Sequence, residues 1–170
     1  MNYFQSKKTL FAILSLMILN ASSNFSVSQT PEGVTTYPEK CKSSVLLKET
    51  KPLLDDYVYD SMKLTKIKYK DVARKKGLDV FLFIDVKHKF IFNTSALPLG
   101  MGITIYDKRP TSKNRKLLFN SGDFPGGDKL IVFDPEEGLS GIYIEYNIPA
   151  ATDNIQYGCV FTVTGYKLEE

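Results

Sequence analysis

The sequence predicts a mainly β protein that folds as an antiparallel β-sandwich with a jelly-roll-like layout. From residue 64 onward, short segments with strand patterns are separated by turn signals rich in Gly, Pro, Asn and Asp. No helical pattern lies between these segments, which excludes an alternation of strands and helices. Aromatic residues make up 12% of the chain and are all Tyr or Phe, which suit half-buried sheet surfaces.

The first predicted strand, which follows Leu64, shows a period of two. Ile67 and Tyr69 face one side, and three lysines, Lys66, Lys68 and Lys70, face the other. This pattern is typical of an outer or edge strand.

Residues 79–86 are apolar on both faces, which predicts a central strand. His88 is predicted in a hairpin turn beyond it. The other predicted strands span residues 89–93, 102–107, 117–119, 129–133, 141–146 and 158–166.

One short helix is predicted before the strands, between residues 45 and 62. Pro52 is compatible with a first helical position there. The apolar residues at helical spacing are Leu53, Leu54, Tyr57, Val58 and Met62. The end of this segment also fits a strand.

Residues 1–23 have the three regions of a signal peptide. Lys7 and Lys8 are basic, residues 9–19 are apolar, and residues 21–23 are small. The apolar region is shorter than the ~20 residues that a membrane-spanning helix needs. We therefore expect a secreted, extracellular protein, or a periplasmic one in a bacterium.

The rest of the chain divides into two parts. Residues 24–42 are rich in Ser, Thr, Pro and Gln and are predicted to form a flexible lead-in. Residues 43–170 are predicted to form a single β-sandwich domain. The formal net charge is +3, and loss of Lys7 and Lys8 with the signal peptide would leave about +1 (3 − 2). Such a nearly balanced charge argues against a nucleic-acid partner.

The chain has two cysteines, Cys41 and Cys159. In an oxidising compartment such a pair favours a disulfide, here between the start of the domain and its last strand. Two separate thiols are the main alternative. A metal site lacks support, because there is no Cys-x-x-Cys spacing and no nearby His.

Four segments in residues 77–166 share strand spacing and a glycine-to-aromatic strand pattern: 77–83, 103–110, 138–146 and 159–165. In these respects this part resembles the bacterial pre-peptidase C-terminal (PPC) domain, a small secreted jelly roll that accompanies hydrolases and is similar in outline to Golgi-dynamics (GOLD) sandwiches. The resemblance implies a secreted β-sandwich. That family often has an Asp before one strand, where this chain has residues 100–102 as Gly-Met-Gly, so a calcium site is not carried over.

No catalytic residue is predicted. His88 lies between Lys87 and Lys89, which disfavour a charged imidazole, and no Gly-x-Ser-x-Gly motif occurs. We therefore interpret His88 as an ordinary loop residue. Metal catalysis through histidines is excluded because the chain has one His.

A cluster of carboxylates accompanies three glycines in a loop region. Its acidic members are Asp123, Asp128, Asp134, Glu136 and Glu137. Asp and Gly are ordinary turn residues, and this interpretation is favoured over a calcium site. A calcium-stabilised structural module and a small secreted hydrolase that uses paired carboxylates are kept as alternatives.

Two basic patches remain as candidate binding surfaces. The first comprises Lys63, Lys66, Lys68, Lys70, Arg74, Lys75 and Lys76, and the second comprises Lys108, Arg109, Lys113, Arg115 and Lys116. A lysine face can meet an anionic surface. The alternative is a solvated face that only blocks edge-to-edge aggregation.

These observations favour a secreted, non-catalytic binding module, such as an effector or an adhesion-like factor. We expect Lys66, Lys68 and Lys70 to engage an anionic surface, which is a lipid headgroup, a glycan or a protein. No metal, cofactor or transmembrane segment is predicted. Asn24 and Asn93 begin N-glycosylation motifs if the host secretes through an endoplasmic reticulum.

Overall fold

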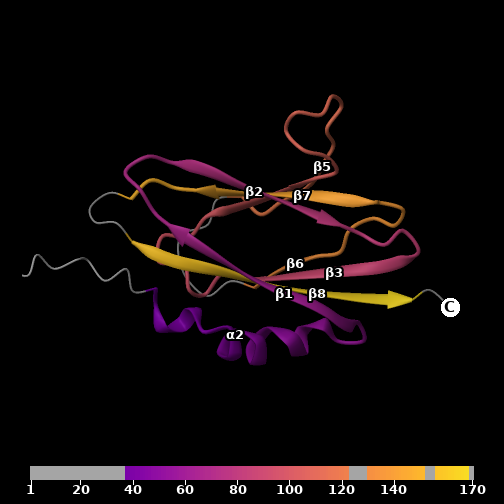
Figure 1. Ribbon diagram of the computed structural model, residues 1–170, viewed down its shortest axis with the longest axis horizontal. Coiled ribbons are helices and arrows are strands. Elements are labelled where there is room, and N and C mark those ends of the chain that lie inside the picture. Colours follow the sequence, from indigo (N-terminus) through magenta and orange to yellow (C-terminus); the bar gives the residue numbers. More distant parts are fainter. Residues whose placement is uncertain (1–36, 123–129, 152–155, 169–170) are drawn as a thin grey trace, which may run out of the picture. The chain divides into compact units, whose positions relative to one another are not determined.

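The computed structural model describes residues 37–122, 130–151 and 156–168. The predicted signal peptide and Asn24 lie outside the described residues. Eight strands are present in the described part (Figure 1). They are β1 (Val58–Lys68), β2 (Arg74–Phe81), β3 (Val86–Asn93), β4 (Gly102–Tyr106), β5 (Leu117–Asn120), β6 (Leu130–Phe133), β7 (Gly141–Ile148) and β8 (Tyr157–Leu168).

The strands form two four-stranded sheets in which every pairing is antiparallel. Sheet A has the order β1-β8-β3-β6, and sheet B has the order β2-β7-β4-β5. The predicted antiparallel β-sandwich is therefore confirmed. Along the chain, the strands switch between the sheets at every step except from β4 to β5. We propose from this order that the sandwich is a jelly roll.

The main core fills the space between the two sheets. Ile67 and Tyr69 enter it beside sheet A, and Ile103 and Ile144 enter it from sheet B; all four are fully buried. The Tyr69 hydroxyl donates to Gly100 O at 2.9 Å, which satisfies its polar group. Burial raises the pKa of Tyr69 far above its usual value.

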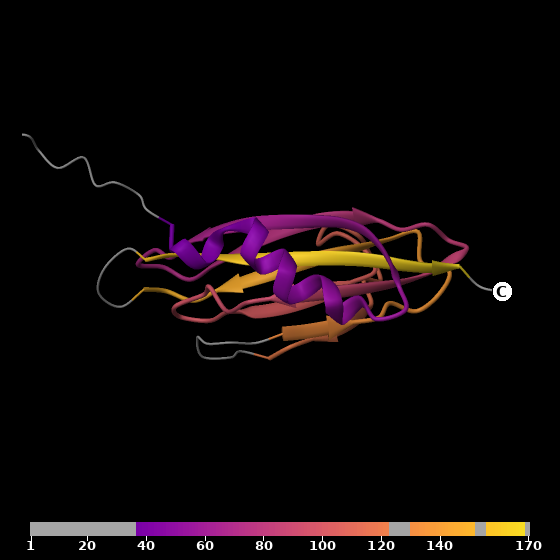
Figure 2. The ribbon, with the colours of Figure 1, turned by 90° about the horizontal axis from the view of Figure 1, so that it is seen from below.

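A helical layer covers the outer face of sheet A (Figure 2). It consists of a 3-10 turn η1 (Glu39–Cys41), helix α2 (Ser43–Thr50) and a second 3-10 turn η2 (Lys51–Leu54). Leu46 and Leu54 are 2% exposed and pack with Ile91 and Phe161 of the sheet. The structure therefore has a second, smaller core outside the sandwich.

The helix lies nearer the N-terminus than the sequence predicts. α2 ends at Thr50, and Pro52 is the second residue of the 3-10 turn η2 that follows it. The turn stops at Asp55, whose φ of 58° cannot continue a right-handed helix. Tyr57, which was assigned to the helix, follows this turn, and Val58 starts β1.

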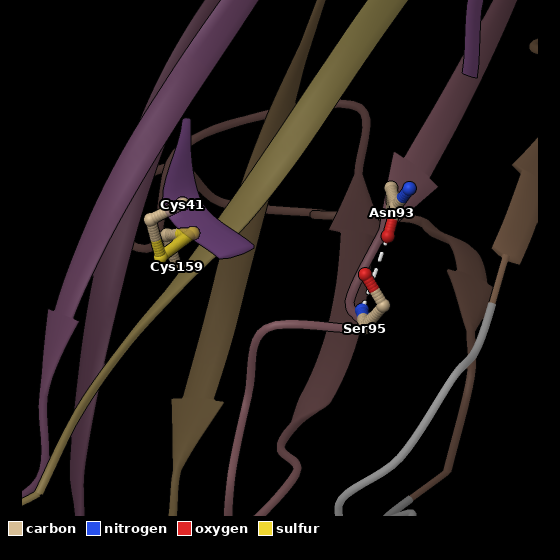
Figure 3. The surroundings of a disulfide bond; sticks show 4 residues. All are labelled: Cys41, Asn93, Ser95 and Cys159. Carbon is tan, nitrogen blue, oxygen red and sulfur yellow. Dashed lines mark hydrogen bonds between the residues drawn. A yellow bond between two sulfur atoms is a disulfide. The ribbon is translucent and has the colours of Figure 1, made fainter. Parts of the chain in front are cut away.

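Residues 37–42, assigned to the lead-in from the sequence, pack against the domain. Cys41 and Cys159 form a disulfide with a Cα–Cα distance of 6.0 Å (Figure 3). The predicted disulfide is therefore present, and it joins η1 to β8. Cys159 is fully buried, so the bridge belongs to the small core.

The prediction of a central strand over residues 79–86 is wrong. β2 ends at Phe81, residues 82–85 form a turn, and β2 is the edge strand of sheet B. The segment is apolar on both faces because Phe81 and Phe83 stay exposed, while Leu82 is 8% exposed and reaches the core. His88, predicted in a turn, lies in β3 and is 9% exposed.

Candidate functional site

The lysine face of β1 is the candidate site, and β1 is an edge strand of sheet A. The alternation predicted for this segment is present, since Ile67 and Tyr69 are buried while Lys66 and Lys70 are exposed and Lys68 is half-buried. The strand geometry separates alternate Cα atoms by about 6.6 Å. Lys66 and Lys68 lie in β1 and Lys70 lies two residues past its end, and we call these three residues the lysine row.

Two tyrosines lie beneath the lysine row. Lys66 Nζ is 4.8 Å from the ring centroid of Tyr37, and Lys68 Nζ is 5.6 Å from that of Tyr157. The two rings contact each other edge to face at 5.2 Å. A ring under an ammonium group attracts it and restricts its rotamers, so the tyrosines hold two of the lysines in place.

The lysines of the row have no acidic partner among the described residues. Within these residues, no carboxylate lies in ion-pair distance of six members of the first basic patch: Lys63, Lys66, Lys68, Lys70, Arg74 and Lys76. By contrast, Lys75 contacts Glu145 at 2.9 Å, and the hydrogen bond raises the pKa of Lys75. The lysine row is therefore left with positive charge that this part of the chain does not neutralise.

Two other basic residues close the free edge of β1. Arg74 Nη2 donates to Lys68 O at 2.6 Å, and Lys76 Nζ donates to Lys66 O at 3.3 Å. These bonds occupy backbone carbonyls that another strand would otherwise use. At this end of β1, β2 side chains thus provide protection against edge pairing.

The second basic patch is largely neutralised. Arg109 contacts Asp79 at 2.6 Å, Lys116 contacts Glu136 at 2.9 Å, and Lys108 contacts Asp107 at 3.3 Å. Most of the positive charge of this patch is thus paired with acidic side chains of the same surface.

Arg115 in the second patch belongs to an aromatic cluster on the outer face of sheet B. Its guanidinium stacks on Tyr106, with 3.1 Å between its Cζ and the ring centroid, and lies 5.3 Å from Tyr143. The buried Glu145 carboxylate lies 3.9 Å from Arg115. This cluster was not predicted from the sequence, although a Glu within an apolar strand is a signal for a buried ion pair.

The carboxylate cluster is only partly described, because Asp123 and Asp128 lie outside the described residues. Asp134, Glu136 and Glu137 are exposed, and Glu137 contacts Lys87 at 3.2 Å. Among the described residues, no group of three or more His, Cys, Asp or Glu side chains could hold a metal ion.

His88 contacts the turn between β2 and β3 through its imidazole ring. Phe83 N donates to His88 Nε2 at 3.1 Å, and the two rings stack with centroids 6.2 Å apart. The single histidine thus holds the turn between β2 and β3.

Asn93 is buried and hydrogen-bonded, which bears on the predicted glycosylation motif. Its Nδ2 donates to Thr50 Oγ1 at 3.1 Å. Its Oδ1 accepts from Ser95 N, also at 3.1 Å (Figure 3). The side chain is 3% exposed. A glycan on Nδ2 would displace this bond to α2, so the folded domain does not present Asn93 as an acceptor.

Comparisons with known proteins give no family. No family model matches the sequence, and no curated protein matches it. Among solved structures, a chain in a structure of infectious bursal disease virus, Gx strain, is matched at 16% identity and a TM-score of 0.27. The match covers 65% of this chain and 33% of the viral chain, and at this TM-score it carries no argument. In the part of the chain that the structure describes, no helix is long and apolar enough to cross a membrane.

Proposed function

We propose that this protein is a secreted, non-catalytic binding module that engages an anionic partner through the lysine row. One observation carries the proposal: Lys66, Lys68 and Lys70 keep unneutralised charge, while the neighbouring basic patch is paired with acids. The ring contacts of Tyr37 and Tyr157 support it further, since groups held in place lose less entropy on binding.

Among anionic partners, a linear sulfated glycan is the one we favour. The lysine row follows the end of β1, where Lys66 and Lys68 are separated by about 6.6 Å, and continues to Lys70, two residues past the strand. A chain of regularly spaced sulfates can follow such a row, whereas a membrane surface is contacted best by a flat patch. The signal-peptide pattern of residues 1–23 and the Cys41–Cys159 bridge support a location where such glycans occur. The resemblance to secreted PPC-type sandwiches is compatible with this role.

The test replaces Lys66, Lys68 and Lys70 together by Gln. The matched control replaces Lys108, Lys113 and Lys116 by Gln, which removes the same charge from the second patch. Binding to immobilised heparin is measured for both variants and wild type at two salt concentrations. If each lysine near an anionic surface contributes about 1 kcal/mol, the first variant binds about a hundredfold more weakly at low salt.

The control variant should bind nearly as well as wild type, and only the first variant should show a reduced salt dependence. Equal losses in both variants would mean that net charge, and not the lysine row, determines binding. Vesicles containing phosphatidylserine serve as a second ligand. Stronger lysine-dependent binding to these vesicles than to heparin would assign the row to a lipid headgroup instead.

A further inference from the structure

The turn between β2 and β3 carries an exposed group of large apolar side chains. Phe81 is 87% exposed, Phe83 is 71% exposed and Ile84 is 58% exposed. We call these three residues the apolar tip. Leu168, which is 65% exposed, pairs with Val86 at the base of the turn. A group of exposed apolar residues of this size on one short segment is often a site of interaction with another molecule.

The apolar tip is held in a fixed shape by its neighbours. Leu82, between the two phenylalanines, is buried in the main core, and its N–H donates to Ser140 O at 3.1 Å. His88 holds Phe83 through the backbone hydrogen bond and the ring stacking described above. The exposure is therefore built into the fold, and little further ordering is needed on binding.

The size of the apolar tip favours a lipid bilayer over a second protein chain. A fully exposed large apolar side chain presents about 150–250 Å², so at the exposed fractions given above the three residues offer about 320–540 Å². A stable protein interface takes about 800 Å² from each partner. A protruding turn can instead insert into a deformable acyl-chain boundary, which needs no complementary groove.

The charges around the apolar tip are balanced. Three basic residues at this end contact acids: Lys87 with Glu137, Lys167 with Asp56, and Arg109 with Asp79. Asp85, in the turn itself, is exposed. This end therefore lacks the excess positive charge that anionic headgroups attract, and its charge balance matches a zwitterionic headgroup.

The apolar tip and the lysine row lie at opposite ends of the same sheet. Val86 pairs with Leu168 at the end of β8, and Lys68 pairs with Tyr157 at its start. Eleven residue steps along a strand separate these positions by about 36 Å. Figure 1 shows β2 ending and β3 beginning at the end of the sandwich where β8 ends. One end is thus free to bind while the other is occupied.

We propose that the apolar tip inserts into the headgroup and acyl-chain boundary of a zwitterionic lipid bilayer. This activity is separate from glycan binding and does not rest on it. With both, the protein would connect an anionic polymer at one end to a membrane surface at the other.

The chain contains no Trp, so a single substitution creates a local fluorescent reporter. Phe83→Trp places the reporter in the apolar tip. Val72→Trp is the matched control, because Val72 is 61% exposed and lies between β1 and β2 at the opposite end. Both variants of the full chain are titrated with phosphatidylcholine vesicles, with and without brominated acyl chains. A local reporter distinguishes the tip from the apolar residues 9–19, which could also contact lipid.

The Phe83→Trp emission should shift to the blue and be quenched by brominated chains, while the Val72→Trp emission stays unchanged. Raising the salt from about 0.1 M to about 1 M should leave the shift in place, because it does not depend on charge. Adding Ile84→Gln to the Phe83→Trp variant should raise the vesicle concentration for half-maximal shift about tenfold.

An unchanged Phe83→Trp emission at saturating vesicle concentration would overturn the proposal. So would a shift that requires phosphatidylserine and disappears at high salt, which would assign lipid contact to the lysines. Sedimentation velocity tests whether a second copy of this chain binds the apolar tip instead. If Phe83→Ser with Ile84→Ser turns a wild-type dimer into a monomer and no vesicle shift occurs, the tip is an interface between copies of this chain.

Discussion

Removing the Cys41–Cys159 bridge by the double substitution Cys41→Ala and Cys159→Ala should destabilise the domain strongly. The two residues are separated by 118 positions in the sequence. In the chain-entropy description, a cross-link that closes a loop of this length removes enough freedom from the unfolded chain to stabilise the fold by about 5 kcal/mol. This is a large share of the ~5–15 kcal/mol that holds a domain folded.

The location of the bridge determines what the loss should look like. Cys159 is central in sheet A, while Cys41 belongs to the helical layer, which is also held by Leu46 and Leu54. Because these apolar contacts remain, the variant should keep its native secondary structure and lose stability as a whole. The effect then acts on the unfolded state.

Urea denaturation followed by circular dichroism and by tyrosine fluorescence measures this effect. With a slope of about 1–3 kcal/mol per molar urea, a loss of about 5 kcal/mol should lower the midpoint by about 2–5 M. Each single Cys→Ala variant should lose as much, because either substitution opens the loop. Wild type treated with a reducing agent is the second control.

Two results would refute the reasoning. A midpoint lowered by less than about 0.5 M would show that the loop-closure argument does not hold here. A variant that loses helical signal while the sheet unfolds at the original midpoint would show that the bridge only clamps the helical layer.

Two further predictions concern the core. Gly158→Ala should lower the free energy of unfolding by about 1–3 kcal/mol, because a Cβ there would lie 2.6 Å from Ala96 O. The control Gly138→Ala has open space around it and should lower the free energy of unfolding by only about 1 kcal/mol, because of its φ of 80°. Equal losses of stability in thermal unfolding would contradict this prediction. Burial raises the pKa of Tyr69 in the folded state. The contribution of the neutral Tyr69 side chain to the free energy of unfolding is therefore complete below the ordinary Tyr pKa of about 10 and is lost as the pH rises above that value. Urea midpoints of wild type should therefore fall above about pH 10, and Tyr69→Phe should fall less steeply; identical slopes would exclude Tyr69 as a cause.

The sandwich could be predicted from the sequence because most of its strands have a recognisable pattern in their own residues. Ile67 and Tyr69 alternate with lysines, and the segments from residue 102 onward carry equally plain patterns between turn residues. The disulfide followed from there being only two cysteines. These features depend on neighbouring residues or on composition, which a sequence contains directly.

Features that depend on residues far apart were missed. Tyr37 and Tyr157 meet beneath the lysine row from the two ends of the domain, and no local pattern brings them together. The turn after Phe81 was predicted as strand because exposed apolar residues resemble buried ones in a sequence. Segments where predictions from local sequence patterns fail are often functional sites.

The position of the last strand has a consequence for synthesis. β8 lies between β1 and β3 in sheet A, so the first strand has no neighbour to pair with until residues 157–168 have been made. Pairs such as Val58 with Tyr166 join parts of the chain about 100 residues apart, and such distant pairing is slow to form. A growing chain therefore has to extend past residue 157 before sheet A can form as a whole. This delay is compatible with the secretion that we propose, in which the chain would cross a translocation channel unfolded and fold afterwards.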